Sequence, residues 1–266
     1  MGCLTPFHRK IVDKLTGEEI SVLVPCGKCE DCLKKKQSDW ISRLLLECQV
    51  SLSSFFITLT YDENHLPFPQ GVNKRDVQLF FKRFRKHFSK SQKFTYFLCS
   101  EYGSISSRPH YHFLLFCRFD LEFIPLSYLL ADSWDSGQHK IGTVDVSSIA
   151  YCSKYCLKSR VDVRHFYRNK TFALMSKRPA IGFDLFKIKD QFVERKCFEV
   201  VSGDRCVAMP RYYRDRMGFD EQDLLDHYYE IQQKQIQIHR DNPVTVMSEF
   251  DRISKRIAFE RKQSTL

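Results

Sequence analysis

Residues 108–117 read Arg-Pro-His-Tyr-His-Phe-Leu-Leu-Phe-Cys, and this run gives the clearest indication of the fold. Its aromatic and apolar content predicts a β-strand over residues 109–117. Side chains of a strand alternate between two faces, so His110 and His112 project from the same face and can bind one cation together. Nine histidines in the chain can also produce such a pair by chance. The alternative is therefore a pair of surface histidines or of histidines with other hydrogen-bond partners.

Two more strands are expected beside this one, over residues 55–61 and 94–101. The Gly-Ser-rich turn after Glu101 favours an antiparallel pairing that brings this carboxylate next to the two imidazoles. Two histidines and one carboxylate leave open positions, as a catalytic metal requires. Mg²⁺ prefers oxygen ligands, Mn²⁺ tolerates imidazole and zinc would compete, so the ion stays open. The alternative for Glu101 is a solvated strand end.

The periodicity of the surrounding residues predicts a mixed α+β fold. Apolar residues at helical spacing predict a helix from Val77 to Phe88 with a basic outer face. The further expected elements are a helix over 124–134, a strand over 142–146 and a helix over 148–159. This order is that of a ferredoxin-like split β-α-β domain, an antiparallel sheet with helices on one face and a site on the open face.

We expect this core to occupy residues 53–160. Residues 1–52 are expected to be a cysteine-rich attachment that ends in a basic amphipathic helix. Residues 161–266 are expected to form a C-terminal appendage that is partly helical, over 223–238 and 248–262.

Two tyrosines follow the core strands. Tyr151 and Tyr155 are four residues apart on the expected helix, so both phenols lie on one face. Lys154 and Lys158 each follow a tyrosine by three residues, and an ammonium one turn away favours the ionised phenol or stabilises a phosphate. Beside a divalent cation, a tyrosine can attack phosphorus and form a covalent phosphotyrosine. The alternative is two amphipathic residues that pack on the sheet.

Three cysteines near the start, Cys26, Cys29 and Cys32, have the spacing of metal ligands. Cys3 is the most economical fourth ligand of a structural zinc, with His8 and Cys48 as substitutes. Iron-sulfur clusters use similar triplets, but the Cys-Pro ending of such runs is missing. The remaining alternative is a reduced loop without metal. A zinc knuckle would hold the lysines at 34–36 against a phosphate backbone.

The composition indicates an anionic partner. The 266 residues contain 42 Lys and Arg against 32 Asp and Glu, a net charge of +10 with a pI near 9.0. Nucleic acid is the first expectation, and the 14% aromatic content offers stacking surfaces. The eleven cysteines and the absence of a secretion segment favour reduced thiols in a cytoplasm. No apolar run is long enough for a membrane span. The sequence also lacks a GxxxxGK[ST] loop, the motif that would indicate a nucleotide-driven motor.

Together these motifs resemble the HUH endonucleases. Residues 56–61 resemble the first strand motif of that group, His110-Tyr111-His112 its histidine motif, and the two YxxK registers its tyrosine motif. Tyr111 is larger and more polar than the usual central residue, and Glu101 falls where the third ligand is expected. With the cysteine cluster and residues 176–182 (Ser-Lys-Arg-Pro-Ala-Ile-Gly), the chain is similar to rolling-circle replication initiators of microviruses of the gokushovirus type.

The resemblance implies an enzyme that nicks an origin with Mg²⁺ or Mn²⁺ and keeps a 5′-phosphate on one tyrosine. It also implies that the released 3′-OH primes a host polymerase, that a host helicase unwinds the strands, and that the second tyrosine closes the circle. The place of action would be the cytoplasm of the host cell. The alternative function is a non-catalytic single-strand binder with a ferredoxin-like sheet.

Overall fold

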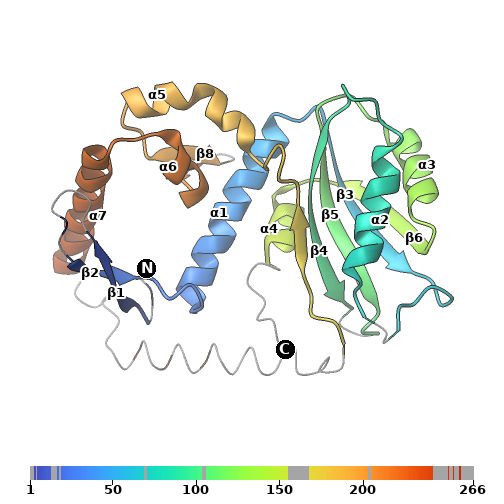
Figure 1. The fold of residues 1–266 in the computed structure, drawn as a ribbon, viewed down its shortest axis with the longest axis horizontal. Coiled ribbons are helices and arrows are strands. Elements are labelled where there is room, and N and C mark those ends of the chain that lie inside the picture. Colours follow the sequence, from blue (N-terminus) through green and yellow to red (C-terminus); the bar gives the residue numbers. More distant parts are fainter. Residues whose placement is uncertain are drawn as a thin grey trace. The chain divides into compact units, whose positions relative to one another are not determined.

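The computed structural model describes residues 3, 5–12, 17, 19–68, 71–103, 106–154, 168–202, 205–241, 251, 254 and 258 (Figure 1). It divides into two compact units. One unit comprises residues 1–38 and 219–266, and the other comprises residues 39–218. Each unit is described by itself.

The second unit contains an antiparallel sheet of five strands, which confirms the predicted α+β class. The order across this sheet is β6-β3-β5-β4-β7. Its members are β3 (Ser53–Tyr61), β4 (Phe94–Tyr102), β5 (Pro109–Cys117), β6 (Gly137–Thr143) and β7 (Ala173–Met175). Because β5 lies between β3 and β4, these strands and the helix that joins them form a split β-α-β unit.

Helices cover both faces of the sheet, so the expectation of one open face was wrong. The helices of the second unit are α2 (Lys74–Arg85), α3 (Phe123–Ser133) and α4 (Val146–Lys154), and α1 (Glu30–Gln49) ends in it. Phe80 and Leu126, from α2 and α3, pack on the face that carries Phe113. Leu44 and Ile149, from α1 and α4, pack on the other face. The apolar stripe of α1 therefore covers the surface that sequence reasoning left open.

Tyr111, the unusual central residue of the histidine motif, is fully buried on the α2 face. Its hydroxyl accepts a 2.7 Å hydrogen bond from the backbone N–H of Asn73, the N-cap of α2, and lies 2.8 Å from the hydroxyl of Tyr61. The Tyr61 hydroxyl also donates to the Asp76 carboxylate at 2.7 Å. Since a buried phenol needs a partner, this network explains why a polar aromatic is tolerated there.

The strand that precedes the tyrosines in the sequence differs from the prediction. A strand was expected over 142–146, whereas β6 covers 137–143 and α4 begins at Val146. The expectation placed the strand too late because Gly137 and the polar residues of β6 weaken its β signal. The backbone of Gly137 has φ of 152° and lies against Thr60, where a Cβ would collide with the Thr60 carbonyl. Glycine is therefore required where β6 begins to pair with β3.

Residues beyond 168 also contribute to the second unit. β7 adds the fifth strand, against β4, which the sequence did not predict. The remaining elements are the 3₁₀ helix η2 (Phe183–Ile188), α5 (Lys189–Glu194), the hairpin of β8 (Glu199–Ser202) and β9 (Arg205–Ala208), and α6 (Arg211–Met217).

A buried carboxylate fastens this later segment to the sheet. Glu47 of α1 is 1% exposed and accepts hydrogen bonds from the Thr95 hydroxyl (2.6 Å), the Arg118 guanidinium (2.7 Å) and the Gly182 backbone N–H (2.6 Å). Gly182 has φ of 75°, and a Cβ there would collide with the Tyr213 hydroxyl, so only glycine fits. Gly182, the last residue of the run at 176–182 that was noted in the sequence, thus has a structural role.

The first unit contains a hairpin that the sequence did not predict. Its strands β1 (Phe7–Val12) and β2 (Glu19–Val24) pair antiparallel, and the first turns of α1 follow. The helix expected over 223–238 lies inside α7 (Glu221–Asp241). Of the helix expected over 248–262, most lies outside the described residues. Among the helices described, none has the length and apolar content needed to cross a membrane.

Candidate metal centre and tyrosine site

The strand register brings the three expected metal ligands together. Glu101 on β4 lies directly opposite His110 on β5, and His112 is the next residue on the same face. Oε2 of Glu101 is 3.5 Å from Nε2 of His110 and 3.4 Å from Nε2 of His112. The ligand atoms of all three lie within 4.8 Å of one another. Their side chains are only 12–17% exposed, so the cluster is largely shielded from water.

Both imidazoles are oriented by partners at their other nitrogen. Nδ1 of His110 lies 3.0 Å from the Arg108 carbonyl, which can only accept, so Nδ1 donates this hydrogen bond and Nε2 faces Glu101. Nδ1 of His112 lies 2.9 Å from the Thr58 hydroxyl on β3. Such outer partners fix the tautomer of metal-binding histidines. Phe56 stacks on the His112 ring, with planes 9° apart and centroids 5.4 Å apart.

Tyr151 approaches this cluster from α4. Its hydroxyl donates a 2.6 Å hydrogen bond to Oε2 of Glu101, the oxygen that faces both imidazoles. Its ring stands edge-on to His112, with centroids 5.2 Å apart and planes at 87°. The ring is 36% exposed, so the phenol reaches the cluster and remains open to solvent. Ile149 and Cys152 on the same helix are buried against the sheet and hold α4 in place.

The donor set fits a divalent cation. Two imidazole nitrogens and one carboxylate oxygen converge, and three ligands leave positions for other oxygen groups. The arrangement suits Mn²⁺ or zinc by its imidazoles and Mg²⁺ by its carboxylate. A phosphate oxygen near such an ion would also be near the Tyr151 hydroxyl, because that hydroxyl already contacts a ligand.

Of the other three residues predicted for the tyrosine site, the structure describes only Lys154. Lys154 is the last residue of α4 and its side chain is exposed. Tyr155 and Lys158 lie outside the described residues. Of the two expected phenols, the structure therefore brings Tyr151 to the histidines.

Sequence reasoning missed the supporting residues. Thr58 and Phe56 belong to the strand motif 55–61 and contact His112. The available signal was the alternation of that strand, which places residues 56 and 58 on one face, but the cross-strand register could not be known. The Arg108 contact uses a backbone carbonyl, for which a sequence carries no signal.

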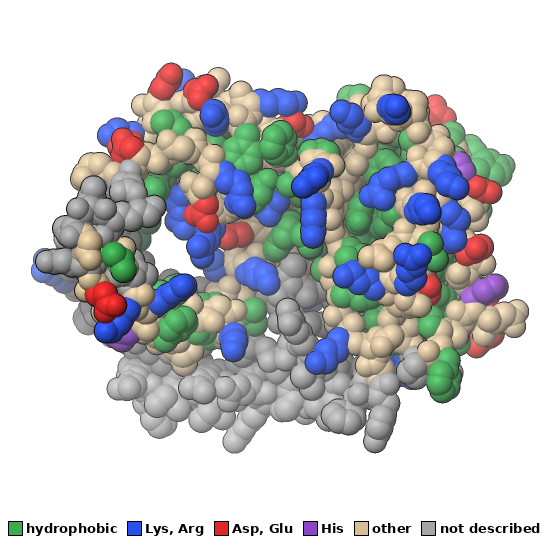
Figure 2. Space-filling view, in the orientation of Figure 1, with side chains coloured by type: hydrophobic (Ala, Val, Ile, Leu, Met, Phe, Trp, Pro, Cys, Tyr) green, Lys and Arg blue, Asp and Glu red, His purple; other side chains and the backbone are tan. Residues whose placement is uncertain are grey.

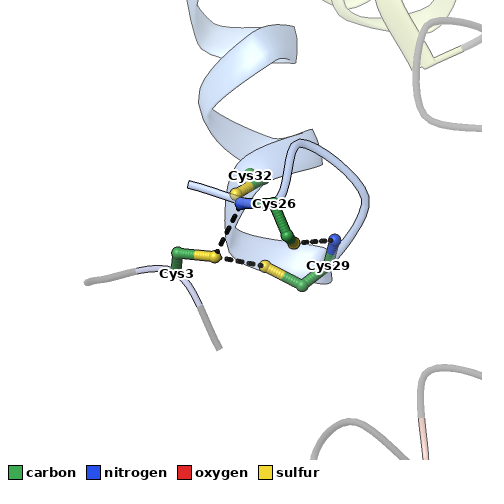
Figure 3. Close-up of side chains that lie close together, drawn as sticks. All are labelled: Cys3, Cys26, Cys29 and Cys32. Atoms are coloured by element: carbon green, nitrogen blue, oxygen red, sulfur yellow. Dashed lines mark hydrogen bonds between the residues drawn. The ribbon is translucent and has the colours of Figure 1, made fainter. Parts of the chain in front are cut away.

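The four expected cysteines also converge, in the first unit (Figure 3). The sulfurs of Cys3, Cys26, Cys29 and Cys32 lie within 4.8 Å of one another. Of the two substitutes, His8 bonds to Ser21 and Cys48 contacts Ser54 in the other unit. None of the described cysteines forms a disulfide.

The turn at Cys26 prepares its sulfur to be a thiolate. The backbone N–H groups of Lys28 (3.4 Å) and Cys29 (3.2 Å) donate to Sγ of Cys26, and Gly27 in the turn has φ of 71°. Burial raises the pKa of this thiol, but hydrogen bonds from Thr5 and these amides outweigh it and lower the pKa to about 6. Burial raises the pKa of Cys3 and Cys32. Thiolate sulfur is the form that binds zinc.

Comparison with known proteins gives a consistent picture. Residues 54–160 match the family described as "Replication-associated protein ORF2/G2P". This range runs from β3 through α4, so it includes the three candidate ligands of the divalent cation and both tyrosines, while the four cysteines lie before it.

The similarity to individual relatives extends over more of the chain than the family match does. It is 27% identical to the replication-associated protein ORF2 of Spiroplasma virus 4, over 79% of this chain and 73% of that protein. It is 29% identical to the replication-associated protein VP4 of Bdellovibrio phage phiMH2K, over 76% and 70% respectively. It is 26% identical to the replication-associated protein ORF4 of Chlamydia phage 1, over 82% and 60%. The resemblance to microvirus replication proteins is confirmed, and no solved structure matches the chain.

Proposed function

We propose that this chain, as a relative of phage replication-associated proteins, initiates replication by nicking and rejoining DNA through a tyrosine. The observation that carries the proposal is the 2.6 Å contact between the Tyr151 hydroxyl and the Glu101 carboxylate, which also faces His110 and His112. A nucleophile and a set of metal ligands at one point suit phosphodiester cleavage. The sheet that supports them would be an HUH endonuclease fold.

Each side chain has a defined task in this proposal. Glu101, His110 and His112 hold the divalent cation, which supplies a positive charge to the phosphate when it is bound. Tyr151 gives up its proton to water, because the Glu101 oxygen would be engaged by the cation, and the phenol oxygen attacks phosphorus. The P–O bond to the 3′ oxygen breaks, this oxygen takes up a proton from water and leaves as the 3′-OH, and the 5′ phosphate remains on the phenol. Lys154 and Lys158 would stabilise the phosphate charge, and Tyr155 would serve as the second nucleophile.

The surrounding partners follow from this chemistry. The substrate would be origin DNA in single-stranded form at the point of cleavage, and the released 3′-OH would serve a host polymerase. Because the sequence has no phosphate-binding loop of a motor, a host helicase would separate the strands. The protein would act in the cytoplasm of the host cell.

The experiment combines the protein with a labelled single-stranded origin oligonucleotide and Mn²⁺. A band that survives SDS and disappears with chelator is the expected result, since the linkage is covalent and needs the cation. His110→Ala and His112→Ala should retain DNA binding and lose this band. Glu122→Gln, an exposed carboxylate at the start of α3, is the matched control and should leave it intact. A salt-sensitive mobility shift without an adduct would instead identify a single-strand binder.

We also propose that Cys3, Cys26, Cys29 and Cys32 hold a structural zinc. Four sulfurs within 4.8 Å of one another, with the amide N–H groups of Lys28 and Cys29 directed at Cys26, support this ion more than an iron-sulfur cluster or an empty loop. The cluster joins the start of the chain to the first turn of α1, where Lys34 to Lys36 follow. Its role would be to order this segment for contact with phosphates.

A further inference from the structure

Helix α2 carries a basic surface on the side of the sheet away from the candidate metal centre. Between Asp76 and Glu101 the chain has no acidic residue, and its basic residues there are Lys82, Arg83, Arg85, Lys86, Lys90 and Lys93. Figure 2 shows Lys and Arg side chains gathered over this helix. The buried stripe of α2, which includes Phe80 and Phe84, faces the sheet, so the intervening basic residues face outward.

One flank of this surface is already neutralised. Arg83 donates to the Asp135 carboxylate at 3.0 Å and to the Ser133 carbonyl at 2.8 Å, and His87 lies 3.1 Å from Asp132. These contacts fasten α2 to α3 and the residues that follow it. The side chains of Arg83 and His87 therefore already have carboxylate partners within the protein.

The other flank retains its charge. Among the described residues, no carboxylate lies within 4.0 Å of the nitrogens of Lys82, Arg85, Lys86, Lys90 or Lys93. The Arg85 guanidinium is held 5.6 Å from the centroid of Tyr96 and 5.7 Å from that of Phe94, which limits its motion. Lys82 and Arg85 lie on α2, Lys86 is its C-cap, and Lys90 and Lys93 lie between α2 and β4. Like charges gathered on α2 and the segment after it favour an external anion as their partner.

The position of these charges separates them from the chemistry. His110 and His112 alternate along β5 with Tyr111 and Phe113, which face the α2 layer. The sheet therefore lies between the basic surface and the histidines. DNA bound at α2 has to be a segment that flanks the one at Tyr151.

The chemistry of the surface favours duplex DNA. Single-strand sites combine cations with exposed aromatic rings on which bases stack. Here Phe80, Phe81 and Phe84 are at most 1% exposed, and the outward side offers mainly ammonium groups. We propose that the surface formed by Lys82, Arg85, Lys86, Lys90 and Lys93 binds the phosphate backbone of double-stranded DNA next to the origin, which rests on the proposed nicking function.

The test measures duplex affinity against salt. Lys82→Gln/Lys86→Gln is compared with Lys10→Gln/Lys187→Gln, whose ammonium groups already pair with Glu19 and Asp184. Fluorescence anisotropy with a labelled duplex, between about 50 and about 200 mM salt, gives the slope of log affinity against log salt. The first variant should reduce the magnitude of this slope by about 2, and the control should leave it unchanged. Equal slopes in the first variant and the wild type would overturn the inference.

A second measurement distinguishes this inference from the proposed function. On a short single-stranded oligonucleotide that spans only the nick, the first variant should form the covalent adduct at the wild-type rate. A rate reduced to the same degree as duplex affinity would place the lysines at the cleavage face and overturn the inference. A wild-type protein that binds duplex with the expected slope but never forms an adduct would instead refute the nicking function.

Discussion

The Tyr151 hydroxyl donates a 2.6 Å hydrogen bond to Oε2 of Glu101, the same oxygen that lies 3.5 and 3.4 Å from the Nε2 atoms of His110 and His112. One carboxylate oxygen thus connects the candidate nucleophile on α4 with the candidate metal ligands on β5. A cation that bound Glu101 would compete with this hydrogen bond and free the phenol to approach a phosphate. The three predicted groups form one arrangement because β4, β5 and α4 meet at this end of the sheet.

Thr58 positions His112, and its removal should weaken metal binding. Its hydroxyl is 2.9 Å from Nδ1 of His112, so Thr58→Val leaves that nitrogen without its partner. We expect Mn²⁺ affinity to fall by about 10- to 100-fold, as is typical when the outer partner of a ligating histidine is lost. Electron paramagnetic resonance titration measures the free Mn²⁺. Thr58→Ser retains a hydroxyl and should restore affinity; equal losses in both variants would argue that the threonine methyl group acts by packing.

Glu47 should contribute strongly to stability. In Glu47→Ala the Arg118 guanidinium, the Thr95 hydroxyl and the Gly182 N–H all lose a buried acceptor. We expect the free energy of unfolding to fall by roughly 1–3 kcal/mol for each of the two neutral donors, Thr95 and Gly182, that loses its acceptor, while Arg118 keeps Asp184 as a partner at 2.9 Å. Urea denaturation followed by circular dichroism provides the value. Glu122→Ala, at an exposed position, should change it by no more than about 0.5 kcal/mol. A loss that small in Glu47→Ala would show that the network is dispensable.

Tyr111 should make the protein sensitive to alkali. Burial raises the pKa of its phenol to about 12, above its ordinary value of 10.0. The folded state therefore keeps a proton that the unfolded chain releases, so this contribution is complete below pH about 10 and is lost as pH rises through about 12. Stability measured across this range should fall less steeply in Tyr111→Phe. At neutral pH that variant should lose about 1–3 kcal/mol, because the Asn73 N–H loses its acceptor. Parallel pH curves for the two proteins would contradict this role.

The cysteine cluster should bind about one zinc per chain. Inductively coupled plasma mass spectrometry of the purified protein measures the content directly. Cys29→Ser removes a buried member of the cluster and should lose the metal. Cys206→Ser, at an exposed cysteine on β9, is the matched control and should retain it. Protein that is fully folded and contains neither zinc nor iron would favour a reduced loop without metal.

The core strands were predictable because local patterns determine them. Residues 55–61, 94–101 and 109–117 alternate or run apolar between clear turns, and the structure places strands there. The pairing of Glu101 with His110 followed from a short turn between adjacent strands. The cysteine cluster followed from ligand spacing alone.

Other features depend on contacts that no local pattern carries. β7 is three residues long and joins the sheet only because β4 offers an unpaired edge. The buried role of Glu47 contradicts the usual exposure of glutamate, and its partners lie far along the chain, at Arg118 and Gly182. Helix α1 covers the second face of the sheet through long-range packing, in which Leu44 clusters with Phe97 and Leu114. No local pattern predicts this packing either.

The most direct test of the central claim identifies the residue that carries DNA. The protein is incubated with a single-stranded origin oligonucleotide and Mn²⁺, digested with nuclease and protease, and analysed by tandem mass spectrometry. The account predicts a nucleotide on Tyr151 in the wild type, and its loss at that position in Tyr151→Phe while Mn²⁺ affinity is retained. Adducts confined to a residue other than Tyr151 or Tyr155, or persisting in the double variant Tyr151→Phe/Tyr155→Phe, would contradict it.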